Sequence, residues 1–379
     1  MRPLVALDLP GGPAFLRSLA HCLEDGEAFA PIDQRLSGPA RQRVLSVLRP
    51  TDIIDELGER HHLQGGEPVE DGDLVVVTTS GTTGEPKGVI LTEAAVLASA
   101  KATSARLNVE PTTDHWLCSL PLNHVGGLSV VLRALLTETA ITLLSGFDAQ
   151  LIGEALDQGA SLTSLVPTTL ARLGRSQSDR FRKVLLGGSA MPPNLPTNVV
   201  TTYGMTESGS GVIYDRQPLD GVEIKIRYDG EITLRCPMLL RAYRNGVDPK
   251  DGEGFFHTGD IGSLNEQGEL TVFGRSDELI ISGGENIWPM AIEQLLDDTP
   301  GINQIGVTGI DDPEWGQSVV AIVVKDPSIE INLARLNEQC RSAIGPWAVI
   351  RKIITVENLP RTSIGKLDRK RLAELGRSR

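Results

Sequence analysis

The chain has 379 residues, which exceeds one ordinary hydrophobic core and fits either a large domain with a smaller one or two domains of middling size. Its 40% hydrophobic and 22% charged residues are typical of ordinary soluble proteins and argue against a disordered or fibrous chain. Acidic residues outnumber basic ones by 49 to 36, and the resulting net charge of −13 argues against nucleic acid or an anionic membrane as a partner.

Four cysteines lie far apart without a CxxC pair, which argues against a zinc knuckle or a disulfide framework: Cys22, Cys118, Cys236 and Cys340. The amino-terminal stretch MRPLVALDLPGG has one arginine and a broken apolar segment that is too short for a secretion signal. No run of apolar residues is long enough to span a bilayer. We therefore expect a cytoplasmic protein.

The first part of the chain alternates helical patterns with short apolar runs. Residues 15–23 and 40–48 carry apolar residues at helical spacing and predict surface helices. Strands are predicted at apolar runs over residues 74–77, 141–144, 161–166, 183–188 and 199–204. This alternation predicts an α/β domain, and because several runs end in glycine or hydroxyl residues, we expect a ligand site at the carboxyl ends of the strands.

From about Gly221 onward the pattern changes to shorter alternating segments separated by DG, NG and QG pairs, which predict antiparallel hairpins. Later segments predict a small α+β domain: a helix over 291–298, strands over 302–309 and 319–324, a helix over 333–343, a strand near 349–356 and a basic tail. A charged link at residues 275–278 separates the two patterns. The predicted domains are therefore 1–275 and 276–379.

The stretch TTSGTTGEPKG, residues 78–88, directly follows the apolar run LVVV. A surface turn would explain its glycines but not its lysine. A phosphate loop of the common NTPase kind is disfavoured, because Lys87 is followed by Gly88 instead of a serine or threonine. Glycine N–H groups, hydroxyls and a lysine nevertheless suit a bound anion.

This stretch resembles the signature of the acyl-adenylate-forming, or AMP-binding, enzymes, which include acyl-CoA synthetases, firefly-type luciferases and peptide-synthetase adenylation domains. Further segments resemble the family's motifs in the same order: LPLNHVGG (120–127), TTYGMTES (201–208), HTGDIG (257–262), GRSDELIISGGEN (274–286) and PRTSIGKLDR (360–369). The resemblance covers nearly the whole chain from residue 74 onward. It implies an adenylation domain of mixed sheets and helices, with a shortened N-terminus, and a small mobile C-terminal domain.

The resemblance also implies the chemistry. A carboxylic acid and ATP, with Mg²⁺, would form an acyl-AMP and pyrophosphate, and the thiol of CoA would then replace AMP. Four residues are expected at the reacting groups: Lys366, Thr206, Glu207 and His124. Lys366 would bridge the carboxylate and the α-phosphate, Thr206 would donate to the α-phosphate, and Glu207 would bind the metal.

The resemblance assigns ATP to a larger set of residues: Thr79, Ser80, Gly81, Thr82, Thr83, Gly84, Lys87, Gly187, Gly188, Ser189, Ala190, Tyr203, Gly204, Met205, Asp260 and Arg275. In this set Asp260 would accept both ribose hydroxyls, and the turn at 187–192 would hold adenine. Plainer explanations exist for some of them. Asp260 could simply belong to a turn before a strand, the turn at 187–192 is by itself only glycine-rich, and Lys366 could belong to a solvated basic tail.

The acyl pocket is expected from another group of residues: His124, Gly126, Arg133, Gly188 and Gly204. We expect His124 to orient the carboxylate or gate the pocket more readily than to transfer a proton. Arg133 could bind a second carboxylate of the substrate, or it could be a surface arginine with its charged end in solvent. CoA is expected near Gly283, Gly284 and Glu285, although these glycines could also merely build a hairpin. The hinge of the small domain is expected at Asp277.

Within the superfamily, the wording RSDELIISGGENIWP, the DPEWGQ turn (312–317) and the short length resemble the 2-succinylbenzoate–CoA ligases of menaquinone biosynthesis. Two features depart from the family pattern. Asn123 and the pair Gly126–Gly127 differ from the residues more frequent in the acyl-pocket motif, and the phosphate loop begins as early as residue 78, which leaves a shortened N-terminal part. Three alternatives stay open: a ligase for another aromatic or fatty acid, an adenylation protein that loads a carrier protein, and a non-catalytic nucleotide-binding homologue. A homodimer is also expected.

Overall fold

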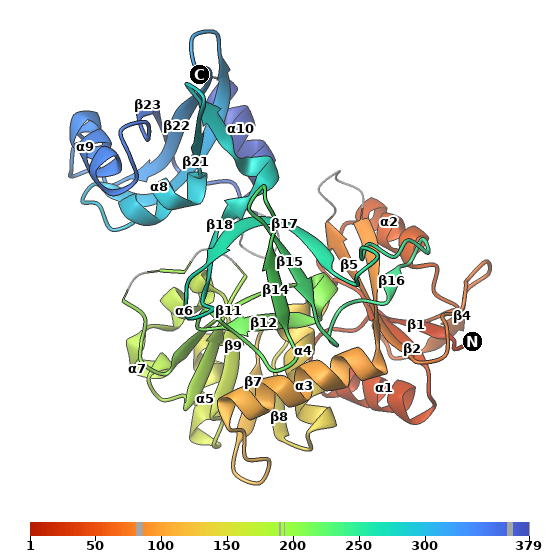
Figure 1. Ribbon diagram of the computed structural model, residues 1–379. Coiled ribbons are helices and arrows are strands. Elements are labelled where there is room, and N and C mark those ends of the chain that lie inside the picture. Colours follow the sequence, from red (N-terminus) through yellow and green to blue (C-terminus); the bar gives the residue numbers. More distant parts are fainter. Residues whose placement is uncertain (81–85, 189–190, 193, 362–366, 379) are drawn as a thin grey trace. The chain divides into compact units, whose positions relative to one another are not determined.

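The computed structural model describes the chain except for residues 81–85, 189–190, 193, 362–366 and 379 (Figure 1). The chain forms two compact units, made up of Met1–Gly188, Leu195–Ile224 and Leu234–His257 in the first, and of Ser189–Asn194, Lys225–Thr233 and Thr258–Arg379 in the second. The predicted α/β class, with a large part of mixed sheets and a small α+β part, is confirmed. The domain boundary at residues 275–278 stays a prediction.

One seven-stranded sheet of the first unit has the order β16-β6-β5-β2-β1-β3-β4. Its strands are β16 (Ala242–Tyr243), β6 (Pro86–Thr92), β5 (Asp73–Ser80), β2 (Ala28–Pro31), β1 (Leu4–Leu7), β3 (Asp52–Ile54) and β4 (Arg60–His62). β1 pairs in parallel with β2 and β3. The hydrophobic pattern of the sequence predicts no strand at β1. Its four residues LVAL are all buried, so the polar alternation that marks a half-exposed strand is missing.

The other seven-stranded sheet has the order β13-β12-β11-β10-β9-β7-β8. Its strands are β13 (Gln217–Pro218), β12 (Ser210–Tyr214), β11 (Val199–Met205), β10 (Lys183–Leu186), β9 (Leu162–Leu165), β7 (His115–Cys118) and β8 (Ala140–Leu143). The five strands from β8 to β11 run parallel, and β12 and β13 return antiparallel. The runs predicted as strands over 141–144, 161–166, 183–188 and 199–204 are therefore confirmed.

The helices of the first unit are α1 (Pro13–Glu24), α2 (Gly38–Leu48), α3 (Glu93–Leu107), α4 (Val125–Leu136), α5 (Ala149–Asp157), α6 (Pro167–Leu173) and α7 (Arg175–Ser178), with a short 3₁₀ helix η1 (Thr206–Ser208). The helices predicted over 15–23 and 40–48 are confirmed as α1 and α2. Local signals explain α3, because the Thr92 side chain accepts a hydrogen bond from the Ala95 N–H and the helix ends at Asn108 in the left-handed conformation.

A four-stranded sheet has the order β14-β15-β17-β18, with β14 (Glu223–Ile226), β15 (Glu231–Arg235), β17 (Phe256–Leu264) and β18 (Leu270–Arg275). The second unit continues with the 3₁₀ helix η2 (Ser276–Glu278) and a five-stranded sheet of β20 (Glu285–Ile287), β19 (Ile280–Ser282), β22 (Gly316–Lys325), β21 (Ile302–Asp312) and β23 (Ile350–Val356). Its helices are α8 (Pro289–Leu296), α9 (Leu333–Ala343) and α10 (Arg369–Arg377).

The strand β22 shows why the five-stranded sheet needs a cover on each face. Val319, Ala321 and Val323 pack with residues of α8 and α9, whereas Val320 and Ile322 pack with Leu372 of α10. Successive side chains of a strand point to opposite faces, so both sets are buried. The expectation of a basic tail at the C-terminus is therefore wrong: residues 369–377 form an amphipathic helix whose Leu372 is fully buried.

The four cysteines are free thiols, and three of them, Cys22, Cys118 and Cys340, are buried. Burial raises the pKa of Cys22 and Cys118 to about 12 and that of Cys340 to about 11. Cys236 is partly buried, and its pKa is also raised by burial. Across the described ranges, no helix combines the length and apolar character needed to cross a bilayer.

Candidate functional site

The expected phosphate loop lies at the end of an antiparallel hairpin formed by β5 and β6. Thr79 pairs with Lys87 and Ser80 with Pro86, so the two strands hold the ends of the loop side by side. Gly88 allows close packing here, because a Cβ at this position would lie 2.8 Å from the Cβ of Arg244. The predicted residues Gly81, Thr82, Thr83 and Gly84 lie outside the described residues, as does the side chain of Ser80.

Lys87 is connected to Glu207 through a tyrosine that the sequence analysis did not single out. The Lys87 Nζ atom lies 5.1 Å from the ring centroid of Tyr243. The Tyr243 hydroxyl donates a hydrogen bond to Oε1 of Glu207 at 3.0 Å. Burial, and secondly the Glu207 charge, raise the pKa of Tyr243. The hairpin thus brings the predicted phosphate-binding lysine and the predicted metal ligand to one place.

No signal in the sequence pointed to Tyr243. It lies in LLRAYRNG, outside all the motifs quoted above. Its position follows from the pairing of β16 with β6, in which Tyr243 faces Val89. The two partners are more than 150 positions apart in the sequence, and such a pairing leaves no local pattern.

Glu207 is presented by the tight turn η1 at the carboxyl end of β11. The backbone N–H of Met205 donates to Oγ of Ser208 at 3.0 Å, which closes the turn that begins at Thr206. Gly204 is required by packing, because a Cβ there would lie 2.0 Å from the Ser210 carbonyl oxygen on β12. The predicted residues Tyr203, Gly204, Met205, Thr206 and Glu207 therefore form one continuous segment at the strand end.

The predicted adenine turn follows β10. A Cβ at Gly187 would lie 2.4 Å from Oγ1 of Thr202, so the chain turns away directly beside β11. Gly188 has a φ of 91°, a conformation that favours glycine. Ser189 and Ala190 lie outside the described residues.

His124 precedes α4 as its N-cap residue. Its Nε2 lies 3.1 Å from Nδ2 of Asn123, and the same amide nitrogen donates to Oδ2 of Asp33 at 3.3 Å. Burial opposes ionisation of Asp33, but hydrogen bonds from Arg35 outweigh it and lower the pKa of that carboxyl group. Asn123 therefore anchors His124 to a buried, ionised acid.

The glycine pair at the start of α4 has unequal roles. A Cβ at Gly127 would lie 2.5 Å from the Pro121 carbonyl oxygen, so this residue allows the helix to pack directly on the preceding backbone. A Cβ at Gly126 would lie 3.6 Å from Cδ1 of Leu120, which is ordinary van der Waals contact. Of the two glycines that differ from the more frequent family motif, only Gly127 is therefore required by packing.

Arg133 of α4 is buried, with only 2% of its surface exposed, so the alternative of a surface arginine with its charged end in solvent is wrong. Its guanidinium carbon lies 4.8 Å from the centroid of the Trp116 ring. Within the described ranges, Nε and Nη1 have no hydrogen-bond partner. Burial lowers the pKa of this arginine.

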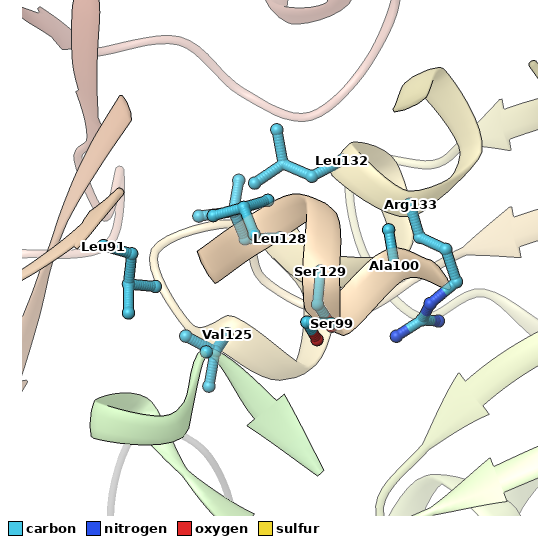
Figure 2. A pocket seen from close by; sticks show the side chains of 10 residues that line it. Leu91, Ser99, Ala100, Val125, Leu128, Ser129, Leu132 and Arg133 are labelled. Atoms are coloured by element: carbon cyan, nitrogen blue, oxygen red, sulfur yellow. The ribbon is translucent and has the colours of Figure 1, made fainter. Parts of the chain in front are cut away.

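Arg133 lines a small cavity between α3 and α4 (Figure 2). The cavity walls also include Val125, Leu128, Ser129 and Ser99. Its volume of about 10 Å³ is room for roughly one water molecule. A larger group could reach the guanidinium only if the surrounding side chains moved.

In the second unit, the predicted ribose ligand and the predicted nucleotide arginine face each other. Asp260 of β17 pairs with Arg275 of β18, and Arg275 Nη1 lies 3.3 Å from Asp260 Oδ1. Arg275 Nη1 also donates to the Thr258 carbonyl at 2.7 Å. Burial opposes its charged form, but Asp260 and Asp277 outweigh it and raise the pKa of Arg275.

The predicted CoA segment forms a tight hairpin. Ser282 pairs with Glu285, and Gly283 and Gly284 between them have φ values of 63° and 85°. Positive φ at both central residues is the geometry that favours glycine in two-residue hairpins. The Gly283 N–H donates to the Trp315 carbonyl at 2.8 Å, and a Cβ at Gly283 would lie 3.1 Å from the Trp315 ring. Trp315 therefore supports the turn, a role the sequence did not reveal.

Lys366 lies outside the described residues, but both flanks of its segment are fixed. Arg361 forms an isolated bridge with Leu367, and the Asp368 N–H donates to the Pro360 carbonyl at 2.9 Å. Arg369 then binds two carboxylates, those of Glu278 and Glu293. The expected hinge residue Asp277 lies in η2 beside Glu278, and its side chain is 56% exposed.

Comparison with known proteins yields two family matches. The profile of the AMP-binding enzyme family matches residues 16–232, and that of the AMP-binding enzyme C-terminal domain matches residues 291–366. A probable 2-succinylbenzoate–CoA ligase from Mycobacterium tuberculosis is 38% identical over 360 residues, which cover 87% of this chain and 92% of the relative. The 2-succinylbenzoate–CoA ligase of Enterococcus faecalis is 33% identical over 90% of this chain and 78% of its own length.

Solved structures agree with these matches. The o-succinylbenzoate CoA synthetase (MenE) from Bacillus subtilis, in complex with the acyl-adenylate intermediate OSB-AMP, aligns with a TM-score of 0.85 and 26% identity. The alignment covers 98% of this chain and 88% of that one. The same enzyme has been solved with ATP and magnesium ion, again with a TM-score of 0.85. Since the first family profile alone covers more than half of the 379 residues, this chain belongs to the AMP-binding enzyme family.

Proposed function

We propose that this protein is an ATP- and CoA-dependent ligase that activates 2-succinylbenzoate as an acyl-adenylate, a reaction of menaquinone biosynthesis. The carboxylate and ATP give acyl-AMP and pyrophosphate, and the thiol of CoA then attacks the acyl carbon and releases AMP. Support comes from relatives named for this reaction at 33–38% identity and from the neighbouring structure that holds OSB-AMP. Both span most of the chain.

The first half-reaction brings two anions together, so cations and hydrogen-bond donors at the phosphates carry most of the catalysis. Thr79 and Lys87 at the hairpin end are assigned to the triphosphate, with Thr206 and Lys366 at the α-phosphate. Magnesium, when bound, neutralises charge on phosphate oxygens. Glu207 fits it, because one carboxylate together with phosphate oxygens and water suits a small hard cation.

The ribose and the adenine ring are assigned to further residues. Asp260 is assigned to the ribose hydroxyls, and Arg275 orients it through the contact between Nη1 and Oδ1. Gly187 after β10 and Gly204 at the end of β11 leave no room for a Cβ, so these two strand ends pack closely against their protein neighbours. Adenine is assigned to this place, with Tyr203 beside it.

Arg133 is the residue that favours a substrate with two carboxylates. Among the described residues, Nε and Nη1 of the buried guanidinium have no hydrogen-bond partner, which is costly, and a substrate carboxylate would supply one. His124 and Gly126, at the start of the same helix, are assigned to the opposite part of the acyl pocket. Binding requires the small cavity beside Arg133 to widen by movement of its lining side chains.

The second half-reaction is assigned to the hairpin turn at Gly283, Gly284 and Glu285. The absence of side chains at the two glycines lets the thiol arm of CoA pass close to the backbone. The small domain, taken as residues 276–379, would swing about Asp277 between the two steps. A cytoplasmic location, which agrees with four free thiols, and a homodimer complete the proposal.

The test is a pyrophosphate-exchange screen with the purified chain, ATP, Mg²⁺ and a panel of acids that includes 2-succinylbenzoate, followed by thioester formation with CoA. We expect exchange that depends on 2-succinylbenzoate, with AMP as the nucleotide product. Formation of ADP alone would reject the reaction class. Exchange only with other aromatic or fatty acids would reject the substrate, and transfer to a phosphopantetheinyl carrier but not to CoA would identify a carrier-loading protein.

A further inference from the structure

Tyr243 lies between the two charged side chains that the proposed function places nearest the phosphates. Its hydroxyl reaches the Glu207 carboxylate at 3.0 Å, and its ring face lies 5.1 Å from the Lys87 ammonium. Tyr243 therefore contacts both charged side chains, Lys87 through its ring and Glu207 through its hydroxyl.

The backbone fixes this tyrosine independently of its two side-chain contacts. Tyr243 faces Val89 in the pairing of β16 with β6. Its N–H donates to the Val247 carbonyl at 2.9 Å, and its carbonyl accepts from Gly246 at 2.9 Å. Lys87 is two residues before Val89 on the same strand, so the ring and the lysine lie on one face of the hairpin. The backbone of Tyr243 is thus fixed on both sides by main-chain hydrogen bonds.

We propose that Tyr243 is a positioning residue for the metal–nucleotide complex: its hydroxyl orients the Glu207 carboxylate and its ring holds the Lys87 ammonium apart from that carboxylate. The hydrogen bond engages Oε1, and Oε2 is the oxygen that we assign to the cation. Hydrogen bonds of this kind orient metal-binding carboxylates and tune their affinity. The ring face attracts the ammonium through its negative potential without neutralising it, so the charge remains available to phosphate.

This proposal rests on the assignment of Glu207 and Lys87 to the nucleotide site. Its test is therefore binding and not only turnover. ATP affinity of the full-length chain is measured by isothermal titration calorimetry across a series of Mg²⁺ concentrations, without acid or CoA. The variants are Tyr243→Phe, which keeps the ring but removes the hydroxyl, and Tyr243→Leu, which removes both. Tyr228→Phe is the matched control, since Tyr228 is 96% exposed.

We expect Tyr243→Phe to need about 10- to 100-fold more Mg²⁺ for half-maximal ATP binding. We expect Tyr243→Leu, in addition, to weaken ATP binding by about two- to fivefold at saturating Mg²⁺, because Lys87 loses its aromatic partner. Tyr228→Phe should match the wild type. Circular dichroism confirms that each variant is folded, and if Tyr243→Leu does not fold, Tyr243→Phe alone decides.

A wild-type Mg²⁺ dependence in folded Tyr243→Phe would overturn the proposal, as would ATP binding by the wild type that does not depend on Mg²⁺. The proposed function fails in a different way. If the wild type binds ATP with Mg²⁺ but no acid supports pyrophosphate exchange, the ligase assignment is lost, while the Tyr243 variants still test the positioning role.

Discussion

Arg369 donates from Nη2 to Oε2 of Glu293 at 3.0 Å, which links the first residue of α10 to the middle of α8. The Glu293 side chain is 9% exposed, and Arg369 also lies 3.2 Å from Glu278. One guanidinium thus compensates two carboxylates inside the second unit. It does so three residues after Lys366, so it fixes the start of the helix that follows the lysine segment.

Arg369→Met should destabilise the second unit by about 2–3 kcal/mol, because two largely buried carboxylates lose their shared partner. Differential scanning calorimetry of the full-length chain measures the change as a lower transition temperature. Arg371→Met is the control, since the Arg371 side chain is 71% exposed and forms an ion pair with Asp368. Equal transition temperatures for both variants would contradict the importance of this cluster.

Lys366→Ala should lower the rate of acyl-AMP formation by at least about a thousandfold, because a cation at the α-phosphate stabilises charge in the transition state. Thioester formation from supplied acyl-AMP and CoA should remain close to wild type. Both half-reactions are measured separately, with Lys370→Ala, an exposed lysine of α10, as the control. Equal loss in the two half-reactions would refute the assigned role.

Arg133→Met should lower kcat/KM for 2-succinylbenzoate by about 100-fold or more, because the proposed contact with the second carboxylate would be lost. The same substitution should not lower the melting temperature, because it removes a buried charge that lacks hydrogen-bond partners at Nε and Nη1. An analogue without the second carboxylate provides the control, and its turnover should change little. A similar loss with both acids would mean that Arg133 does not read the second carboxylate.

Gly127→Ala should destabilise the chain by about 1–3 kcal/mol, because the new methyl group would collide with the Pro121 carbonyl. Gly126→Ala should change stability by less than about 1 kcal/mol, since it meets only ordinary contact distances in the same helix. The two variants are compared by thermal denaturation. Similar melting temperatures would show that α4 can shift to accept either side chain.

Stability should fall in mild acid partly because of His115, whose Nε2 lies 2.8 Å from Oγ1 of Thr142. Burial lowers the pKa of His115 from its ordinary 6.5, so below that pH the unfolded chain binds a proton more readily than the folded one. Above pH 6.5 His115 therefore does not reduce the stability of the folded chain. As the pH falls below 6.5 and through the lower pKa of the folded state, burial of this histidine makes the folded chain progressively less stable. His115→Gln should flatten the melting-temperature curve between about pH 7.5 and 5.5; an unchanged slope would exclude this contribution.

The alternating helices and strands of the first unit could be predicted because their side chains follow regular periods. The strand β1 could not, since LVAL is buried throughout and is too short to be distinguished from any apolar run. The helix α10 could not be predicted because its sequence is mostly polar: six of the nine residues in RKRLAELGR are not apolar. The role of Leu372 becomes clear only from its packing against β22.

The candidate site divides in the same way. Lys87, Glu207, Asp260 and Arg275 lie in contiguous motifs, so the sequence predicted them. Tyr243 and Trp315 act through neighbours that are distant in the sequence, and no local pattern distinguishes them from ordinary core or surface aromatics. The burial of Arg133 could not be read from helical spacing alone, because a long side chain at that spacing can reach solvent or the interior.

The raised pKa of every native thiol has a practical use. Thiols that stay protonated at neutral pH react slowly with maleimide dyes, so the unmodified chain should accept little label. A single substitution such as Tyr228→Cys, at a 96% exposed position, would then introduce one reactive handle without prior removal of any cysteine. A dye on this cysteine, paired with one on a second introduced cysteine, would test the swing proposed for the small domain.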